Sequence, residues 1–301
     1  GDAEQQAAAL ATSLFFHEVR SDHDVVIKLI GEATTSIDAV ASPPIRVISA
    51  VARLGACSLR GEFVESERIY QESAGWYDRS QHARHVSLTG ADFGVLQRAW
   101  SAHGLWALGR PGDARARVGE ALALARDLAH PFSEALALAY EAMLEQIDGD
   151  RAACARAATA ALAVSERHRV IYYAAWSRIL LAWVEGAAAP TAQASALLRA
   201  RIEAFVETGA RARLPYYLTL LADIERRCGE FHAALRTLDE ALAVSRAQGE
   251  LWWNAEVHRL RAAALGTLGR AGDAGRSVEE GLAIARRQQA PAFEARLLSP
   301  A

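Results

Sequence analysis

The stretch GEFHAALRTLDEALAVSR, residues 229–246, decides the fold. Its apolar residues recur three and four positions apart, which is the spacing of one face of an α-helix. Stretches of the same pattern follow one another at intervals of forty residues, beginning at Gly109, Gly149, Ala189, Gly229 and Gly269. Their shared large apolar position holds Leu122, Leu162, Ile202, Leu242 and Leu282. A repeat of fixed length predicts a stack of similar units, because one unit alone cannot bury its apolar face.

Small residues recur in the same register. After each turn they are Ala114, Cys154, Ala194, Ala234 and Ala274, and before it they are Ala102, Ala142, Ala182, Ala222 and Ala262. We interpret each unit as two amphipathic helices that approach closely at these positions and are joined by a short turn. Glycine at the turn fits a left-handed helix C-cap. Cys154 occupies one of the small positions, so we expect it to be a packing residue.

Two weaker units precede the regular ones. They turn near Ser21 and at Gly61, again forty residues apart. The equivalent positions hold Val26, Ile30 and Ala33 in the first unit and Ser66, Tyr70 and Ser73 in the second. From Gly61 to Gly109 the spacing is forty-eight residues, which predicts an extra loop within residues 79–94.

These observations predict an all-α protein, a right-handed α-solenoid of about seven helix pairs with a forty-residue period. We expect one array over residues 1–301, without a second domain. Its parts would be weaker units over 1–82, the insertion over about 79–94, regular units over about 93–290, and a short C-terminal cap over 291–301.

Composition narrows the possible functions. The 301 residues are 51% hydrophobic with a net charge of −3, so a basic face for nucleic acid is not expected. No apolar run reaches the roughly 18 residues that a membrane span needs. Cys57, Cys154 and Cys228 are far apart, which favours a reducing, cytoplasmic compartment over a disulfide framework. The first residues lack the basic region of a signal peptide, and without an initiator Met the chain is expected to be a piece of a longer protein.

The repeat resembles the tetratricopeptide repeat (TPR). Residues 229–246 match its turn and second helix: a glycine, an aromatic residue, an alanine, a large apolar residue, then Ala-Leu. The forty-residue period is longer than the ~34 residues usual for that repeat. Each helix of this TPR-like array would therefore gain nearly one turn.

Further segments resemble the C-terminal region of large bacterial signalling ATPases, known as predicted ATPases of the signal-transduction NTPase type. The segments are YDRSQH (77–82), GADFGV (90–95), LWALGRPGDA (105–114), LAHPFSEALAL (128–138), LPYYLTLLAD (214–223) and GELWWNAEVHRLRAAAL (249–265). Those proteins carry an adenylate/guanylate cyclase, protein kinase or winged-helix DNA-binding domain, then an AAA-like NTPase, then a helical array. The resemblance covers about residues 50–290. It implies that this chain is the protein-interaction or sensor module of a signalling or transcription-regulating ATPase.

The chain itself shows no catalytic set of residues. It contains neither a Walker A phosphate loop nor a dinucleotide fingerprint. No spacing assembles a Ser-His-Asp or Cys-His arrangement. The one His-x-x-His pair, His82 and His85, has no third ligand nearby, so a metal site is not expected. We therefore predict that this chain is not an enzyme and that it holds no cofactor.

The concave face is the first candidate binding site. In stacked helix pairs, the first helix of each unit lines the inner surface, where a partner binds. The residues at inward positions are His103, Trp106, Met143, Trp176, Trp183, Tyr216, Asp223, Arg226, Glu256 and Arg259. Aromatic residues in the middle units and charged residues in the last two suit a partner protein, a peptide or another domain of the parent chain. The alternative partner is a small-molecule effector held by the aromatic groove.

Two pairs of tryptophans leave alternatives open. Long helices shift the inward register, so Trp176 and Trp183 are either groove residues or core residues. Trp252 and Trp253 are adjacent and cannot face the same way. We expect one of them in the core and the other exposed or between helices.

The insertion is the second candidate site. Tyr77, Asp78, His82 and Asp92 lie within it or beside it. One interpretation is a functional loop at the rim of the groove. The other, which we favour, is that the Asp and His side chains satisfy backbone groups of the loop that would otherwise be buried and unpaired.

Overall fold

The computed structural model of this chain describes residues 9, 12–14, 16–22, 25, 26, 28–31 and 43–299. Every secondary-structure element over these residues is a helix, as predicted. Ala33 of the predicted first unit lies outside the described residues, as do the last two positions of the predicted cap. Among the described helices, none has both the length and the apolar character that crossing a bilayer requires.

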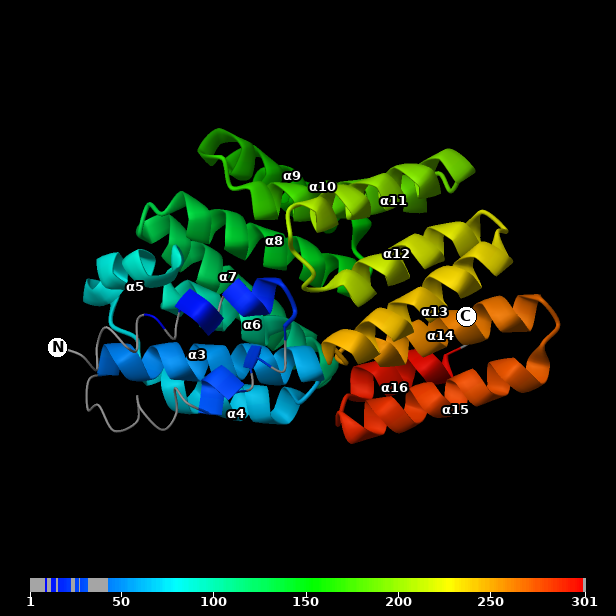
Figure 1. Ribbon diagram of the computed structural model, residues 1–301, viewed down its shortest axis with the longest axis horizontal. Coiled ribbons are helices and arrows are strands. Elements are labelled where there is room, and N and C mark those ends of the chain that lie inside the picture. Colours follow the sequence, from blue (N-terminus) through cyan, green and yellow to red (C-terminus); the bar gives the residue numbers. More distant parts are fainter. Residues whose placement is uncertain are drawn as a thin grey trace.

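The helices form a continuous spiral of packed pairs. In chain order they are α3 (Pro43–Arg60), α4 (Phe63–Ser73), η1 (Ala74–Trp76), η2 (Arg79–Gln81), α5 (His82–Thr89), α6 (Phe93–Ala107), α7 (Pro111–Asp127), α8 (Pro131–Asp148), α9 (Arg151–His168), α10 (Ile171–Ala188), α11 (Ala192–Glu207), α12 (Leu214–Arg227), α13 (Phe231–Gln248), α14 (Asn254–Thr267), α15 (Ala271–Arg287) and α16 (Pro291–Leu298). Consecutive helices pack against each other, and Figure 1 shows the pairs rising through α7–α10 and descending through α12–α16. The predicted helical solenoid is confirmed.

The turns repeat as the helices do. Glycines with a positive φ end the first helix of most units: Gly61, Gly109, Gly149, Gly229 and Gly269. At Gly109 the amide donates to the Trp106 carbonyl (2.9 Å). The next amide, of Arg110, donates to the Leu105 carbonyl (2.9 Å), which completes a left-handed helix C-cap. The predicted caps are confirmed at these glycines, whereas Ala189 takes a φ of −138° and ends α10 without one.

The small residues lie where helix backbones meet. Ala114, Cys154 and Ala234 in the second helices are completely buried. The small residues of the first helices are all buried as well: Ala102, Ala142, Ala182, Ala222 and Ala262. Cys154 is thus a packing residue, as expected, and the forty-residue register has a direct structural cause.

The spiral is tight enough for its two halves to meet. The Leu59 carbonyl at the end of α3 accepts hydrogen bonds from the amides of residues 251 and 252 (2.8 and 3.0 Å). Forty residues earlier on both sides, the Val19 carbonyl accepts from the amides of residues 211 and 212 (2.8 and 3.1 Å). Both contacts join residues nearly five repeats apart. The chain therefore covers much of its own inner face.

The insertion is helical, so the prediction of a loop over residues 79–94 is wrong. It contains η2 and α5, and α5 ends at Gly90, whose φ is 78°. The reason is packing: the buried His85 ring lies 4.7 Å from the Phe93 ring, which gives this short helix an apolar face to bury.

Candidate functional site

A cleft of about 420 Å³ opens on the inner side of the last three helix pairs. Residues of α10, α12 and α14 form its walls, and α16 contributes to its rim. Trp183, Asp223, Glu256 and Arg259 line it, and all four belong to the predicted groove. Arg226, also predicted, pairs with Asp223 (3.0 Å) beside the cleft. The structure thus brings these five residues together around one cavity.

The repeat register shows how carboxylates come to line the cleft at this end of the array. The residues at one inward position of successive units are His103, Met143, Trp183 and Asp223. The residues at a second inward position are Trp176, Tyr216 and Glu256. The first position holds a carboxylate in α12, where Asp223 is followed one unit later by Ala263, and the second holds a carboxylate in α14, Glu256. Burying an unpaired charge is costly, and each of these two carboxylates is accordingly paired with arginines at the cleft.

Positive charge exceeds negative charge in the cleft. Asp223 pairs with Arg227 (2.7 Å) as well as with its predicted partner. The Glu256 carboxylate pairs with Arg259 (2.7 Å) and Arg296 (3.4 Å). Burial would raise the pKa of Glu256, but these two arginines outweigh burial and hold that pKa below its ordinary value. With four guanidinium groups around two carboxylates, the cleft favours an anionic ligand.

Two tryptophans in the cleft wall have unpaired hydrogen-bond donors. Trp183 and Trp253 both line the cleft, and each indole Nε1 is buried without an acceptor among the described residues. The Trp253 ring is held by the rings of Tyr216 (5.2 Å) and Phe293 (5.4 Å). Buried polar groups without a partner are uncommon in native proteins. Both donors are closed off from solvent, so the two tryptophans contribute an aromatic wall to the cleft.

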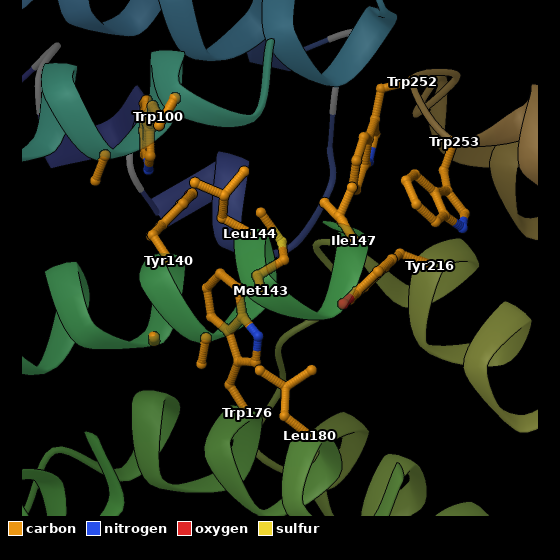
Figure 2. Close-up of a cluster of buried hydrophobic side chains, with 14 of the residues drawn as sticks. Trp100, Tyr140, Met143, Leu144, Ile147, Trp176, Leu180, Tyr216, Trp252 and Trp253 are labelled. Atoms are coloured by element: carbon orange, nitrogen blue, oxygen red, sulfur yellow. The ribbon is translucent and has the colours of Figure 1, made fainter. Parts of the chain in front are cut away.

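Most of the predicted groove residues are buried. His103, Trp106, Met143, Trp176 and Tyr216 lie in the core, and Trp183 and Glu256 are buried although they line the cleft. Figure 2 shows Met143, Trp176 and Tyr216 within one apolar cluster, with Trp252 and Trp253 beside Tyr216. The prediction of an exposed aromatic stripe is wrong, because the tight superhelix packs later units against earlier ones. Both Trp252 and Trp253 are buried. Of the two alternatives for the second tryptophan, the structure shows the one between helices, because the Trp253 ring lies between Tyr216 of α12 and Phe293 of α16.

A polar centre lies inside this core. The buried Arg213 guanidinium stands over the rings of Tyr140 (4.9 Å) and Trp176 (4.8 Å). The Arg213 amide donates to Glu250 Oε2 (2.8 Å), and Trp252 Nε1 donates to Glu250 Oε1 (2.8 Å). Burial raises the pKa of Glu250, although Arg213 opposes the shift. Sequence reasoning missed this centre, because Arg213 and Glu250 lie in the connections between units, where the repeat register gives no signal.

Three of the four residues predicted in the insertion come together, because Tyr77 and His82 both contact the buried Asp92. Asp92 Oδ2 lies 2.9 Å from His82 Nδ1 and accepts a hydrogen bond from the Tyr77 hydroxyl (3.2 Å). Asp92 Oδ1 accepts from the Val95 amide (3.1 Å) and so caps α6. Asp78 stays apart and caps η2 instead. These contacts support the interpretation that the Asp side chains serve the local backbone, whereas His82 contacts the Asp92 carboxylate instead of a backbone group.

Two histidines without a predicted role extend this cluster. His85 Nδ1 lies 3.5 Å from Asp92 Oδ2, and the His130 ring lies 5.1 Å from the His82 ring. Burial would raise the pKa of Asp92, but hydrogen bonds with His85 and His82 hold it below its ordinary value. Over the described part of the chain, no three His, Cys, Asp or Glu side chains are grouped as metal ligands would be.

Comparison with known proteins identifies the fold of this chain but not its function. No protein-family model matches the chain. A protein of Rhizobium meliloti (strain 1021), described as uncharacterized, is 26% identical over 204 residues, which make up 67% of this chain and 20% of the relative. The chain thus spans about a fifth of that relative's length. A solved structure of a Rap protein complexed with Competence and Sporulation Factor matches with a TM-score of 0.65 at 14% identity, over 91% of this chain and 75% of that one. This chain has the fold of a TPR-like helical repeat.

Proposed function

We propose that this chain is a protein-interaction module and that the cleft around Asp223 and Glu256 binds an acidic segment of a partner protein. The observation that carries the proposal is the surplus of positive charge beside an aromatic wall of two tryptophans. Arginine and tryptophan are the residue types that carry most of the energy at interfaces. Guanidinium groups also bind carboxylates through paired, charge-assisted hydrogen bonds. A Rap protein of the same fold, solved in complex with Competence and Sporulation Factor, supports a binding role.

We further infer that the module belongs to a larger signalling or transcription-regulating ATPase. The resemblance of its segments to the arrays of such ATPases supports this, and so does the length of the Rhizobium meliloti relative, which extends far beyond the matched region. In such a parent protein, the acidic segment comes from another domain of the same chain or from a separate protein. The module binds, and the chemistry takes place elsewhere in the parent.

A small anionic effector is the second candidate ligand. The cleft volume of about 420 Å³ lies within the range of small-molecule pockets, roughly 300–1,000 Å³. An effector would bind as a free acid of low molecular mass. A partner segment would instead lose affinity when the residues that flank its acidic group are removed, which separates the two candidates.

The test uses a phage-displayed library of short random peptides, selected on the full chain. Selected sequences are synthesised with blocked ends and titrated by fluorescence anisotropy at low and high salt. Arg259→Ala should weaken binding at least about tenfold, since interface arginines are frequent hot spots. The loss should be larger at low salt, because salt screens the attraction. Glu256 keeps Arg296 in this variant, so the fold is retained.

Arg201→Ala is the matched control, because Arg201 is exposed on α11, on the outer side of the array. It should leave the affinity unchanged. Failure of the selection to enrich any acidic peptide would contradict the proposal. So would acidic peptides that bind Arg259→Ala and Arg227→Ala as tightly as they bind the unmodified chain.

A further inference from the structure

A groove of about 500 Å³ lies where the helical residues 16–19 meet the start of α10 and the connection between α11 and α12. Its lining consists of Phe16, Val19, Arg20, Ile171, Tyr172, Thr208, Gly209 and Ala210. It shares no residue with the charged cleft around Asp223 and Glu256. We call it the α10 groove.

Main-chain and ring contacts hold the walls of the α10 groove together. The Val19 carbonyl accepts hydrogen bonds from the amides of Arg211 and Ala212 (2.8 and 3.1 Å), which directly follow the lining residues of the connection. The Tyr172 ring packs against the ring of the buried Phe205 (5.5 Å between centroids) and so joins α10 to α11. The groove is therefore preformed before any partner binds.

Large hydrophobic side chains of the α10 groove are open to solvent. Phe16, Val19 and Ile171 are 57%, 38% and 69% exposed, and Ile171 is the most exposed large hydrophobic residue among those described. Three of the nine exposed large hydrophobic residues in the described part of the chain thus line one groove. Single exposed apolar side chains are ordinary, whereas a cluster of them marks an interaction site.

The apolar lining contains a single positive charge. Arg20 is the one charged residue among the described residues that line the groove. Its guanidinium lies over the Phe16 ring (5.3 Å), and Asp22, at 3.7 Å from it, binds His17 more closely (2.9 Å). No side chain caps the start of α10, so the helix dipole adds to the positive potential of Arg20. An occupant that matches this lining carries an anionic group beside an apolar one.

The exposure of the lining indicates the size of the occupant. Phe16 and Ile171 are each more than half exposed. Small-molecule sites bury most of their ligand, which an open groove of this kind does not do. The groove is also hollow, so it receives a side chain that projects from a partner. A polypeptide segment that spans the hollow covers both exposed residues.

We propose that the α10 groove binds an amphipathic segment of a partner protein in which a large apolar residue adjoins an acidic one. The apolar side chain packs on Phe16 and Ile171, and the carboxylate pairs with Arg20. The apolar contact supplies most of the affinity, and the ion pair fixes the orientation of the segment. The chain would then bind partners at two separate surfaces, the charged cleft and the α10 groove.

The experiment selects a displayed library of short random segments on the full chain and discards those that the Ile171→Asp variant also retains. An acidic residue is favourable in the first turn of a helix, so this variant keeps its fold. The remaining segments are synthesised with blocked ends and titrated by fluorescence anisotropy. We expect them to share a large apolar residue next to Asp or Glu. Arg20→Ala should weaken their binding at least about tenfold, and more at low salt than at high salt.

Val64→Asp is the matched control, because Val64 is a large hydrophobic residue that is 45% exposed on α4, outside the α10 groove. It should leave the affinity of these segments unchanged. Arg259→Ala, in the charged cleft, should also leave it unchanged. Circular dichroism melts establish that each variant is folded.

Three outcomes would overturn this proposal. One is that no segment remains after the selection against Ile171→Asp. Another is that the remaining segments bind Arg20→Ala as tightly as they bind the unmodified chain. The third is that vesicles of phosphatidylcholine and phosphatidylserine bind the full chain and lose it in Ile171→Asp, which would assign this face to a membrane. Acidic peptides that require Arg259 would leave the first proposed function intact in every case.

Discussion

The middle and last units of this array share the same helix-pair fold, but the chemical character of their inner faces differs. In the middle units, Met143 and Trp176 are completely buried in one continuous core. Two repeats later, at the same positions of the unit, Asp223 and Glu256 line an accessible, charged cleft. The comparison teaches that the inner face of a closed superhelix becomes a second core wherever it is apolar. In the last units the same positions carry paired charges, and a cleft lies beside them.

The contacts that close the superhelix also differ between the two regions. The backbone contacts at Val19 and Leu59 repeat after forty residues, and each carbonyl receives two amides. Forty residues after Leu251 comes Pro291, which has no amide hydrogen and instead lies against Gly109. The last turn of the superhelix is therefore closed by side-chain packing alone at this point. The charged cleft, whose rim includes α16, lies beside the part of the chain with the weaker closure.

The largest effect is expected from Trp176→Ala. Trp176 is completely buried, and its ring packs against Tyr140 (5.1 Å) and against the Arg213 guanidinium (4.8 Å). Truncating a buried tryptophan leaves a cavity and should lower the free energy of unfolding by about 3–5 kcal/mol. Urea denaturation measures the loss. A change below about 1 kcal/mol would show that the middle of the inner face is not a core and would remove the contrast drawn above.

The free energy of unfolding is expected to depend on pH through Glu18, whose side chain is buried. Burial raises the pKa of Glu18 to about 8, while Arg213 opposes and Glu250 reinforces the shift. The folded chain therefore keeps this proton up to about pH 8, whereas the unfolded chain releases it near the ordinary carboxyl pKa of 4.5. Because the folded state binds more protons, the stability falls as the pH rises from 4.5 to 8.

Glu18→Gln keeps the shape of the side chain without its titration. At pH 8 this variant should be more stable than the unmodified chain, by a difference on the order of a few kcal/mol. Near pH 4.5 the two should be equal. Urea denaturation of both proteins at the two pH values isolates Glu18, because every other buried group titrates in both. Parallel pH profiles would show that Glu18 is solvated in the folded chain.

A smaller effect is expected from Ala234→Leu in α13. Ala234 is completely buried at the position where all regular units carry a small residue. The larger side chain should overpack α12 against α13 and cost about 1–3 kcal/mol. Ala233→Leu is the matched control, because Ala233 is only half-buried on the same helix. Equal thermal melts for the two variants would mean that the forty-residue register does not set helix contact.

The sequence predicts this fold almost completely and the site only in part. Helix pairs, turns and small positions follow from local periodicity, so Ala234 and Gly109 are placed correctly. Burial of Trp176 and Trp252 depends on the pitch of the superhelix, which brings together residues nearly five repeats apart. No pattern within one repeat encodes that pitch. Asp223 and Arg259 were better guides, because both line the cleft, whereas Arg213 and Glu250 are buried in the core without any signal in the repeat.

The smallest effect on stability, and the sharpest on binding, is expected from Arg259→Ala. Arg259 keeps 24% of its side chain exposed, and Glu256 retains Arg296 when Arg259 is removed. The free energy of unfolding should therefore fall by less than about 1 kcal/mol, as for other partly exposed ion pairs. The affinity for selected acidic peptides should nevertheless drop at least about tenfold. A large loss of stability without a loss of affinity would make Arg259 a structural residue. The inner face of the last units would then serve stability as that of the middle units does, and the charged cleft would not be the binding site.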